Sequence, residues 1–154
     1  MKMRFLASLL ILLVATPALA AHPLGEPFTL RIGDSAEVGD EGLVVRLVDI
    51  PSDGRCPLSV VCVWEGVAEV LVGARLPDQP EEELLLHTLT GTPQFHPMEA
   101  DYASYRVRLI DLWPYPATTE PINPGVYILT LVVDEVAVPV DEPTWSTLKA
   151  HYRK

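Results

Sequence analysis

Apolar and polar side chains alternate in several short runs between Phe28 and Val140. The clearest run starts at Trp64, because every second residue from there to Leu76 is apolar or small while the residues between them are mixed. A period of two is typical of a strand that buries one face and exposes the other. We therefore predict a strand over Cys62–Leu76, with Trp64 on its buried face beside the cysteines.

The same alternation predicts further strands, and proline- and glycine-containing segments separate them. The predicted strands are Phe28–Ile32, Leu43–Ile50, Leu84–Thr90, Tyr105–Leu109, Tyr127–Val133 and Val136–Val140. Leu84–Thr90 is apolar on both faces, so its register stays open. Gly33–Ser35 is a predicted turn, the acidic stretch Glu37–Glu41 leads into the next strand, and Gly91–Asp101 is a predicted loop. Fifteen prolines also argue against long helices.

About seven short strands separated by turns predict an all-β protein, an antiparallel β-sandwich that is immunoglobulin-like in style. A sandwich and a partly closed barrel fit the pattern equally. Asn123 and Tyr127 have the spacing of a tyrosine corner, in which the tyrosine hydroxyl bonds back to the preceding turn. Pro139 in the last run indicates an edge strand. Residues 141–154 are predicted to form a tail or a short C-terminal helix.

Cys56 and Cys62 are the two cysteines of the chain, and five residues separate them. Zinc and redox pairs usually have two residues between their cysteines, and no second pair completes a metal site. The alternative, a redox-active pair, has only Arg55 nearby to activate a thiol. We predict a structural disulfide that stabilises the fold by about 2 kcal/mol. Asp53 and Arg55 are predicted to form a local salt bridge, with contact to a partner as the alternative.

This stretch resembles a family of small exported bacterial proteins. Members carry Asp-Ser-Arg-Cys-Pro, a second cysteine six residues after the first, and then Trp-Ala-Gly-x-Ala. The matching positions here are Asp53, Arg55, Cys56, Pro57, Cys62, Trp64, Gly66 and Ala68. Gly54 stands where the family has serine, and Glu65 where it has alanine. A weaker likeness runs from Phe28 to about Val133. The family has no established activity, so the resemblance implies export and a β domain rather than a reaction.

Residues 1–20 have the pattern of a signal peptide, with a basic start, an apolar core and a small-residue cleavage site ending at Ala20. The apolar run is too short to span a membrane, so we expect no membrane insertion after signal cleavage. Residues 21–140 would form the domain, in the periplasm or outside the cell. An exported chain also favours disulfide formation.

The formal net charge is −10, and it becomes −12 without the two basic residues of the predicted signal, Lys2 and Arg4. A chain this acidic is not expected to bind nucleic acid or anionic lipid. No serine lies in a nucleophile elbow and no glycine loop is suited to phosphate. We therefore expect no enzyme. A hydrolase that uses paired carboxylates is a third hypothesis, supported only by the abundance of Asp and Glu.

Copper binding is the second hypothesis, and it depends on the histidines. Cleavage one residue later, after Ala21, would make His22 the N-terminal residue, whose amine and imidazole suit Cu(II). His87 or His96 could then add a second imidazole. The alternative is an exposed histidine in the leader and two ordinary loop or strand histidines.

Trp113 and Tyr115 alternate with prolines on one connection. Such a rigid aromatic segment is typical of interfaces. The alternative is that Trp113 plugs the end of the sandwich. The first hypothesis is therefore a non-enzymatic module that binds a protein or envelope component through Trp113 and Tyr115.

Overall fold

The computed structural model describes residues 21–88 and 98–136, and the structural statements below concern these residues. The strands are β1 (Phe28–Leu30), β2 (Ser35–Val38), β3 (Leu43–Asp53), β4 (Ala68–Arg75), β5 (Glu82–His87), β6 (Glu99–Tyr102), β7 (Tyr105–Trp113) and β8 (Ile128–Glu135). A single 3-10 turn, η1 (Pro124–Val126), is the one helical element in this part of the chain. The prediction of an all-β protein is confirmed.

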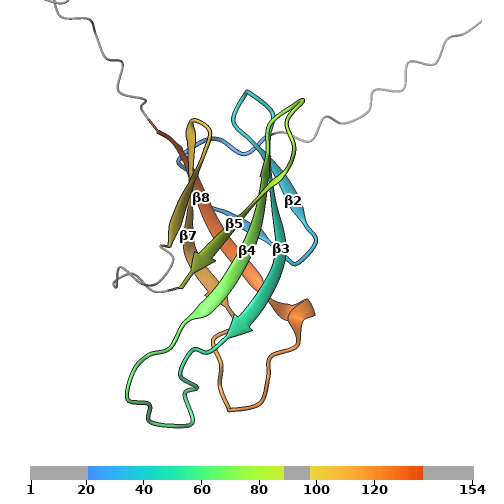
Figure 1. Cartoon of the computed structure of the whole chain (residues 1–154). Coiled ribbons are helices and arrows are strands. Elements are labelled where there is room, and N and C mark those ends of the chain that lie inside the picture. Colours follow the sequence, from blue (N-terminus) through green and yellow to red (C-terminus); the bar gives the residue numbers. More distant parts are fainter. Residues whose placement is uncertain (1–20, 89–97, 137–154) are drawn as a thin grey trace, which may run out of the picture.

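The strands form two four-stranded antiparallel sheets, in the orders β1-β8-β7-β6 and β2-β3-β4-β5. Figure 1 shows the two sheets packed against each other as a sandwich. Each sheet is largely a meander, and β1 joins the second meander by pairing with β8. The protein thus has the two packed antiparallel sheets of an immunoglobulin-like domain. Its strand order is simpler, because apart from β1 and β8 the strands that pair are consecutive in the chain.

The core lies between the sheets. It is formed largely by the apolar side chains that the alternation along the strands predicted to be buried. On β4 the side chains of Val70 and Val72 are fully buried, while Glu69 and Leu71 on the other face are half-buried. On β5 the inward positions are Leu84 and Leu86, which settles the register that the sequence left open. A bulge in β7 between Leu109 and Asp111 shifts the register, so that Leu112 is again buried.

Two strands lie where the sequence predicted none. β2 runs from the end of the predicted turn into the acidic stretch before Leu43, and β6 covers the end of the predicted loop and one residue beyond it. Both are four residues long, lie at the edges of their sheets and carry few buried side chains. An edge strand pairs on one side only and needs little apolar surface, so its sequence shows a weak hydrophobic pattern.

The strand predicted over Cys62–Leu76 begins six residues late, at Ala68. Trp64 was predicted on its buried face, but the side chain is 60% exposed and lies before the strand. The reason is Gly66, whose φ of +69° interrupts the extended backbone. The period-two pattern therefore holds from Ala68 onward and fails before it.

Several predictions fall outside the described residues. These are the signal peptide, His96, Pro139 with most of the last predicted strand, and the tail or helix over 141–154. In the part of the chain that the structure covers, no helix is both long enough and apolar enough to span a bilayer.

Candidate functional site

Arg55 lies at the centre of the disulfide-bearing end of the sandwich, and its side chain is only 6% exposed. Its Nε and Nη2 atoms donate to the two carboxylate oxygens of Asp53, at 2.8 and 2.7 Å. Nη1 donates to the carbonyl oxygen of Leu112 at 2.6 Å, and Nη2 donates to that of Pro114 at 2.8 Å. The guanidinium also lies 5.1 Å from the centre of the Tyr115 ring. The predicted salt bridge is confirmed, and it also binds the connection after β7.

Tyr127 completes this network, because its hydroxyl donates to Oδ2 of Asp53 at 2.8 Å. Asn123 instead accepts from the backbone N–H of Gly125, at the start of η1. The predicted tyrosine corner is therefore wrong in its acceptor: the hydroxyl reaches a carboxylate 74 residues earlier in the chain, not the preceding turn.

The ionisation of this network follows from its burial and hydrogen bonds. Burial works to raise the pKa of Asp53, but the hydrogen bonds from Arg55 and Tyr127 outweigh it and hold that pKa below its usual value. Burial first, and then the bond to the Asp53 carboxylate, raise the pKa of Tyr127 to about 12. The ion pair is thus charged and the phenol neutral at neutral pH.

Backbone geometry places this network at the base of the loop between β3 and β4. This loop, residues 54–67, carries the disulfide and is called the disulfide loop below. Gly54 and Cys56 donate their N–H groups to the carbonyls of Val67 and Glu65, at 2.8 and 2.7 Å. The chain passes so close at Gly66 that a Cβ there would lie 1.9 Å from the carbonyl oxygen of Gly54. Glycine is required at this position both by its φ and by this contact.

The predicted disulfide between Cys56 and Cys62 is present, with an S–S distance of 2.05 Å. The loop that it closes lies against the connection after β7. Leu58 and Ser59 donate their N–H groups to the carbonyls of Pro116 and Ala117, at 3.0 and 3.1 Å. In Figure 1 the two loops extend side by side from one end of the sandwich, one in green and the other in orange.

These two loops carry most of the large exposed hydrophobic side chains. Of the ten among the described residues, seven lie on these loops or, for Trp113, at the last position of β7 where the second loop begins: Leu58, Val60, Val61, Val63, Trp64, Trp113 and Tyr115. We call these seven residues the apolar tip. Val61 and Val63 are as exposed as in an extended peptide, at 102% and 104%. Trp113 is 57% exposed, so it does not plug the sandwich.

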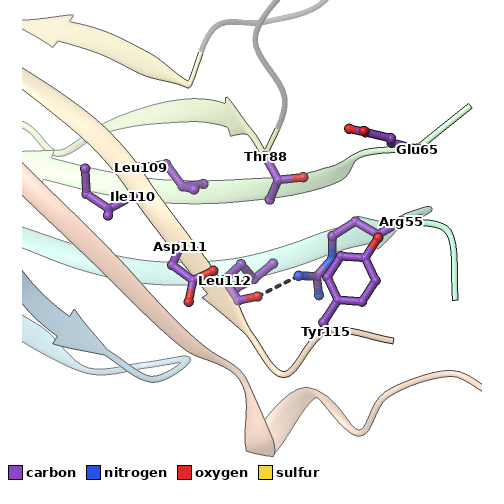
Figure 2. Close-up of a pocket in the computed structure, with 9 residues that line it drawn as sticks. Arg55, Glu65, Thr88, Leu109, Ile110, Asp111, Leu112 and Tyr115 are labelled. Atoms are coloured by element: carbon purple, nitrogen blue, oxygen red, sulfur yellow. Dashed lines mark hydrogen bonds between the residues drawn. The ribbon is translucent and has the colours of Figure 1, made fainter. Parts of the chain in front are cut away.

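A small cavity of about 160 Å³ lies beside the network, between the disulfide loop and the bulge of β7. Figure 2 shows the Tyr115 ring next to Arg55 on one side of it, with Asp111 and Thr88 on other sides. A second cavity of about 270 Å³ also has Asp53 and Arg55 in its wall, and prolines form much of the rest. Arg55 therefore lines both cavities, whereas Asp53 lines only the second.

Of the three predicted copper ligands, His22 and His87 lie within the described residues, and the structure keeps these two apart. The backbone of His22 pairs beside Val38, and its ring stacks on Phe28 with centroids 5.1 Å apart. His87 is 4% exposed and faces Glu69 on β4. The pairing registers place these two histidines at opposite ends of the β2-β3-β4-β5 sheet, about 20 Å apart along the strands. Among the described residues, no three His, Cys, Asp or Glu side chains form a metal-binding group.

Comparison with known proteins adds no assignment, since no family model, curated protein or solved structure matches the chain. A function is therefore inferred from the fold and from the exposed side chains of the apolar tip.

The sequence analysis identified the two aromatic residues of the β7 connection and missed the valines and leucine of the disulfide loop. A signal for them exists: no charged residue occurs from Cys56 to Trp64, or from Leu112 to Thr119. In a chain with 32 charged residues, two uncharged segments of this length on neighbouring loops indicate a shared apolar surface.

Proposed function

We propose that the protein is an exported, non-enzymatic β-sandwich module that binds a component of the cell envelope through its apolar tip. The observation that carries the proposal is the grouping of seven exposed hydrophobic side chains on two adjoining loops. Exposed apolar patches on soluble domains commonly mark interaction sites. Residence in the periplasm or outside the cell is part of the proposal, and it is supported by the disulfide and the pattern of residues 1–20.

Asp53 and Arg55 have a supporting role in this proposal. They are almost entirely buried and satisfy each other, so they hold the two loops in place rather than meeting a partner. Trp113 and Tyr115 supply the aromatic contacts, since both are exposed and lie where β7 ends, at the carbonyls that Arg55 holds.

The test is sedimentation of the purified protein with isolated bacterial envelopes. The variant Trp113→Ala/Tyr115→Ala should keep the circular dichroism spectrum of the parent and lose at least about tenfold in apparent affinity, because aromatic anchors dominate such contacts. Leu24→Ala is the control, because Leu24 is a partly exposed hydrophobic residue outside the tip. Equal binding by the folded double variant and the parent would show that the tip is not the binding surface.

A further inference from the structure

We infer that the apolar tip inserts into the interfacial layer of a lipid bilayer that carries no net negative charge. This inference rests on the proposed function and names the envelope component. It differs from the expectation drawn from the sequence, that no part of the chain enters a membrane once the signal is removed.

The shape of the tip favours a bilayer over a protein. Val61 and Val63 project fully from the disulfide loop, and Leu58 is 76% exposed. Figure 1 shows that this loop and the connection after β7 extend in the same direction from the sandwich. Protein interfaces bury such side chains in complementary pockets surrounded by a polar rim, whereas a bilayer accepts any apolar protrusion.

The composition of the tip matches the two layers of a membrane interface. Its aliphatic side chains suit the acyl region, and Trp64, Trp113 and Tyr115 suit the headgroup boundary, where tryptophan and tyrosine are enriched. No charged residue lies within either loop segment, from Cys56 to Trp64 or from Leu112 to Thr119. Insertion of these segments therefore requires no desolvation of a charge.

The backbone of the loop is also prepared for an apolar environment. Unpaired N–H and C=O groups are costly in a bilayer. Pro57 has no N–H group, and the N–H groups of Leu58 and Ser59 are bonded to the neighbouring connection. The N–H of Val60 donates to the carbonyl oxygen of Pro57 at 3.2 Å. The first half of the loop thus satisfies its donors within the protein.

The loops do not need to be ordered by the membrane. The disulfide closes one loop, and Arg55 fixes the other through the carbonyls of Leu112 and Pro114. A surface that is already organised loses little conformational entropy on binding. The valines are therefore presented in their binding arrangement before contact.

Charge decides which lipid is preferred. The chain has a net charge of −10, and Glu65, Asp111 and Glu120 directly flank the two uncharged segments of the tip in sequence. Anionic headgroups would repel this surface, so we expect zwitterionic lipid to be bound and anionic lipid to bind more weakly.

The experiment is flotation of the purified protein with phosphatidylcholine vesicles. The parent should float with the vesicles. Val61→Asp and Val63→Asp should each lower the partition coefficient at least about tenfold, because a charge replaces a valine that is inserted in the bilayer. Gln79→Asp is the matched control, since it adds the same charge in the turn after β4, at the end of that strand away from the tip. Its partitioning should equal that of the parent.

Fluorescence gives a readout that a fold defect would not mimic. The chain has three tryptophans, and Trp145→Phe leaves only the two of the tip. Their emission should shift to shorter wavelength with vesicles and be quenched by lipids brominated on the acyl chain. No shift and no flotation of the folded parent would overturn the inference, as would stronger binding to phosphatidylglycerol vesicles.

The two proposals can fail separately. If the tip variants lose binding to envelopes while the parent ignores protein-free vesicles, the occupant is an envelope protein or glycan: the lipid inference is wrong and the proposed function stands. If envelope binding is independent of the tip, the proposed function itself is wrong.

Discussion

The same residue type has opposite environments on the two sides of Gly66. Before it, Val61 and Val63 alternate in sequence and are fully exposed; after it, Val70 and Val72 alternate in sequence and are fully buried. The difference is the partner, because β4 pairs with β3 and β5 and faces the other sheet, while the earlier segment is a loop that lies against another loop. Alternation alone therefore does not show whether an apolar residue is in the core.

The boundary between the two regions is built from buried polar groups. Asp53 lies at the end of β3, Arg55 follows it, and Tyr127 precedes β8. Their hydrogen bonds connect the end of the sandwich to both loops. This network allows the sandwich to carry an apolar tip that is ordered and yet outside the core.

Removal of the Arg55 guanidinium should lower the stability of the fold more than any other change considered. Arg55→Met would leave Asp53 buried without its counter-ion and would leave two carbonyls without their donor. We expect the free energy of unfolding to fall by about 3–5 kcal/mol. Urea denaturation followed by circular dichroism measures it.

The control for this variant is Arg108→Met. Arg108 pairs with Asp134 at 2.5 Å, but its side chain is 45% exposed. An exposed pair contributes within about 1 kcal/mol. Equal losses in the two variants would mean that burial of the Asp53–Arg55 pair does not matter for stability.

The two valine environments can be compared directly. Val70→Ala removes two methyl groups from the core and should lower the free energy of unfolding by about 2 kcal/mol. Val61→Ala should change it by no more than about 0.5 kcal/mol. Thermal or urea unfolding of both variants gives the comparison. A cost at Val61 that approaches that at Val70 would show that the disulfide loop is packed in solution, and the apolar tip would then not exist.

The sequence predicted the sandwich well where a strand has one buried face. The alternation along Ala68–Arg75 and along Tyr105–Leu109 was correct because those strands pack against the other sheet. It failed for β2 and β6, which are short edge strands with little buried surface. The cysteine spacing predicted the disulfide because few other roles fit it.

The site was less accessible from sequence, because its parts come from distant segments. The local ion pair between Asp53 and Arg55 was predictable from their spacing. Its contacts to Leu112, Pro114 and Tyr127 span 57 to 74 positions in the chain, and no local pattern encodes them. Gly66, which separates Val61 and Val63 from β4, has a positive φ and passes close to Gly54, and the alternation of apolar residues shows neither feature.

Among the buried side chains considered, the smallest expected loss of stability follows removal of the Tyr127 hydroxyl, which connects the start of β8 to the network. Tyr127→Phe keeps the buried ring and removes the hydrogen bond to Asp53, so we expect a loss of about 1–2 kcal/mol in the free energy of unfolding at neutral pH. The pKa of Tyr127 is raised to about 12 from the ordinary 10.0. A raised pKa means that the folded state holds the proton more tightly than the unfolded state, so this contribution is complete below about pH 10 and is lost as the pH rises toward about 12.

Ultraviolet titration of tyrosinate separates this effect from general alkaline unfolding. Tyr127 should titrate late in the parent, and so should Tyr105, because hydrogen bonding to Glu41 raises the pKa of Tyr105 to about 12. Tyr127→Phe should remove one of them and leave the other. If instead Tyr127→Phe leaves the late-titrating amplitude of the folded protein unchanged, the Tyr127 hydroxyl does not donate to an ionised Asp53 in solution. The tip would then be connected to the sandwich through Arg55 and the loop backbone alone.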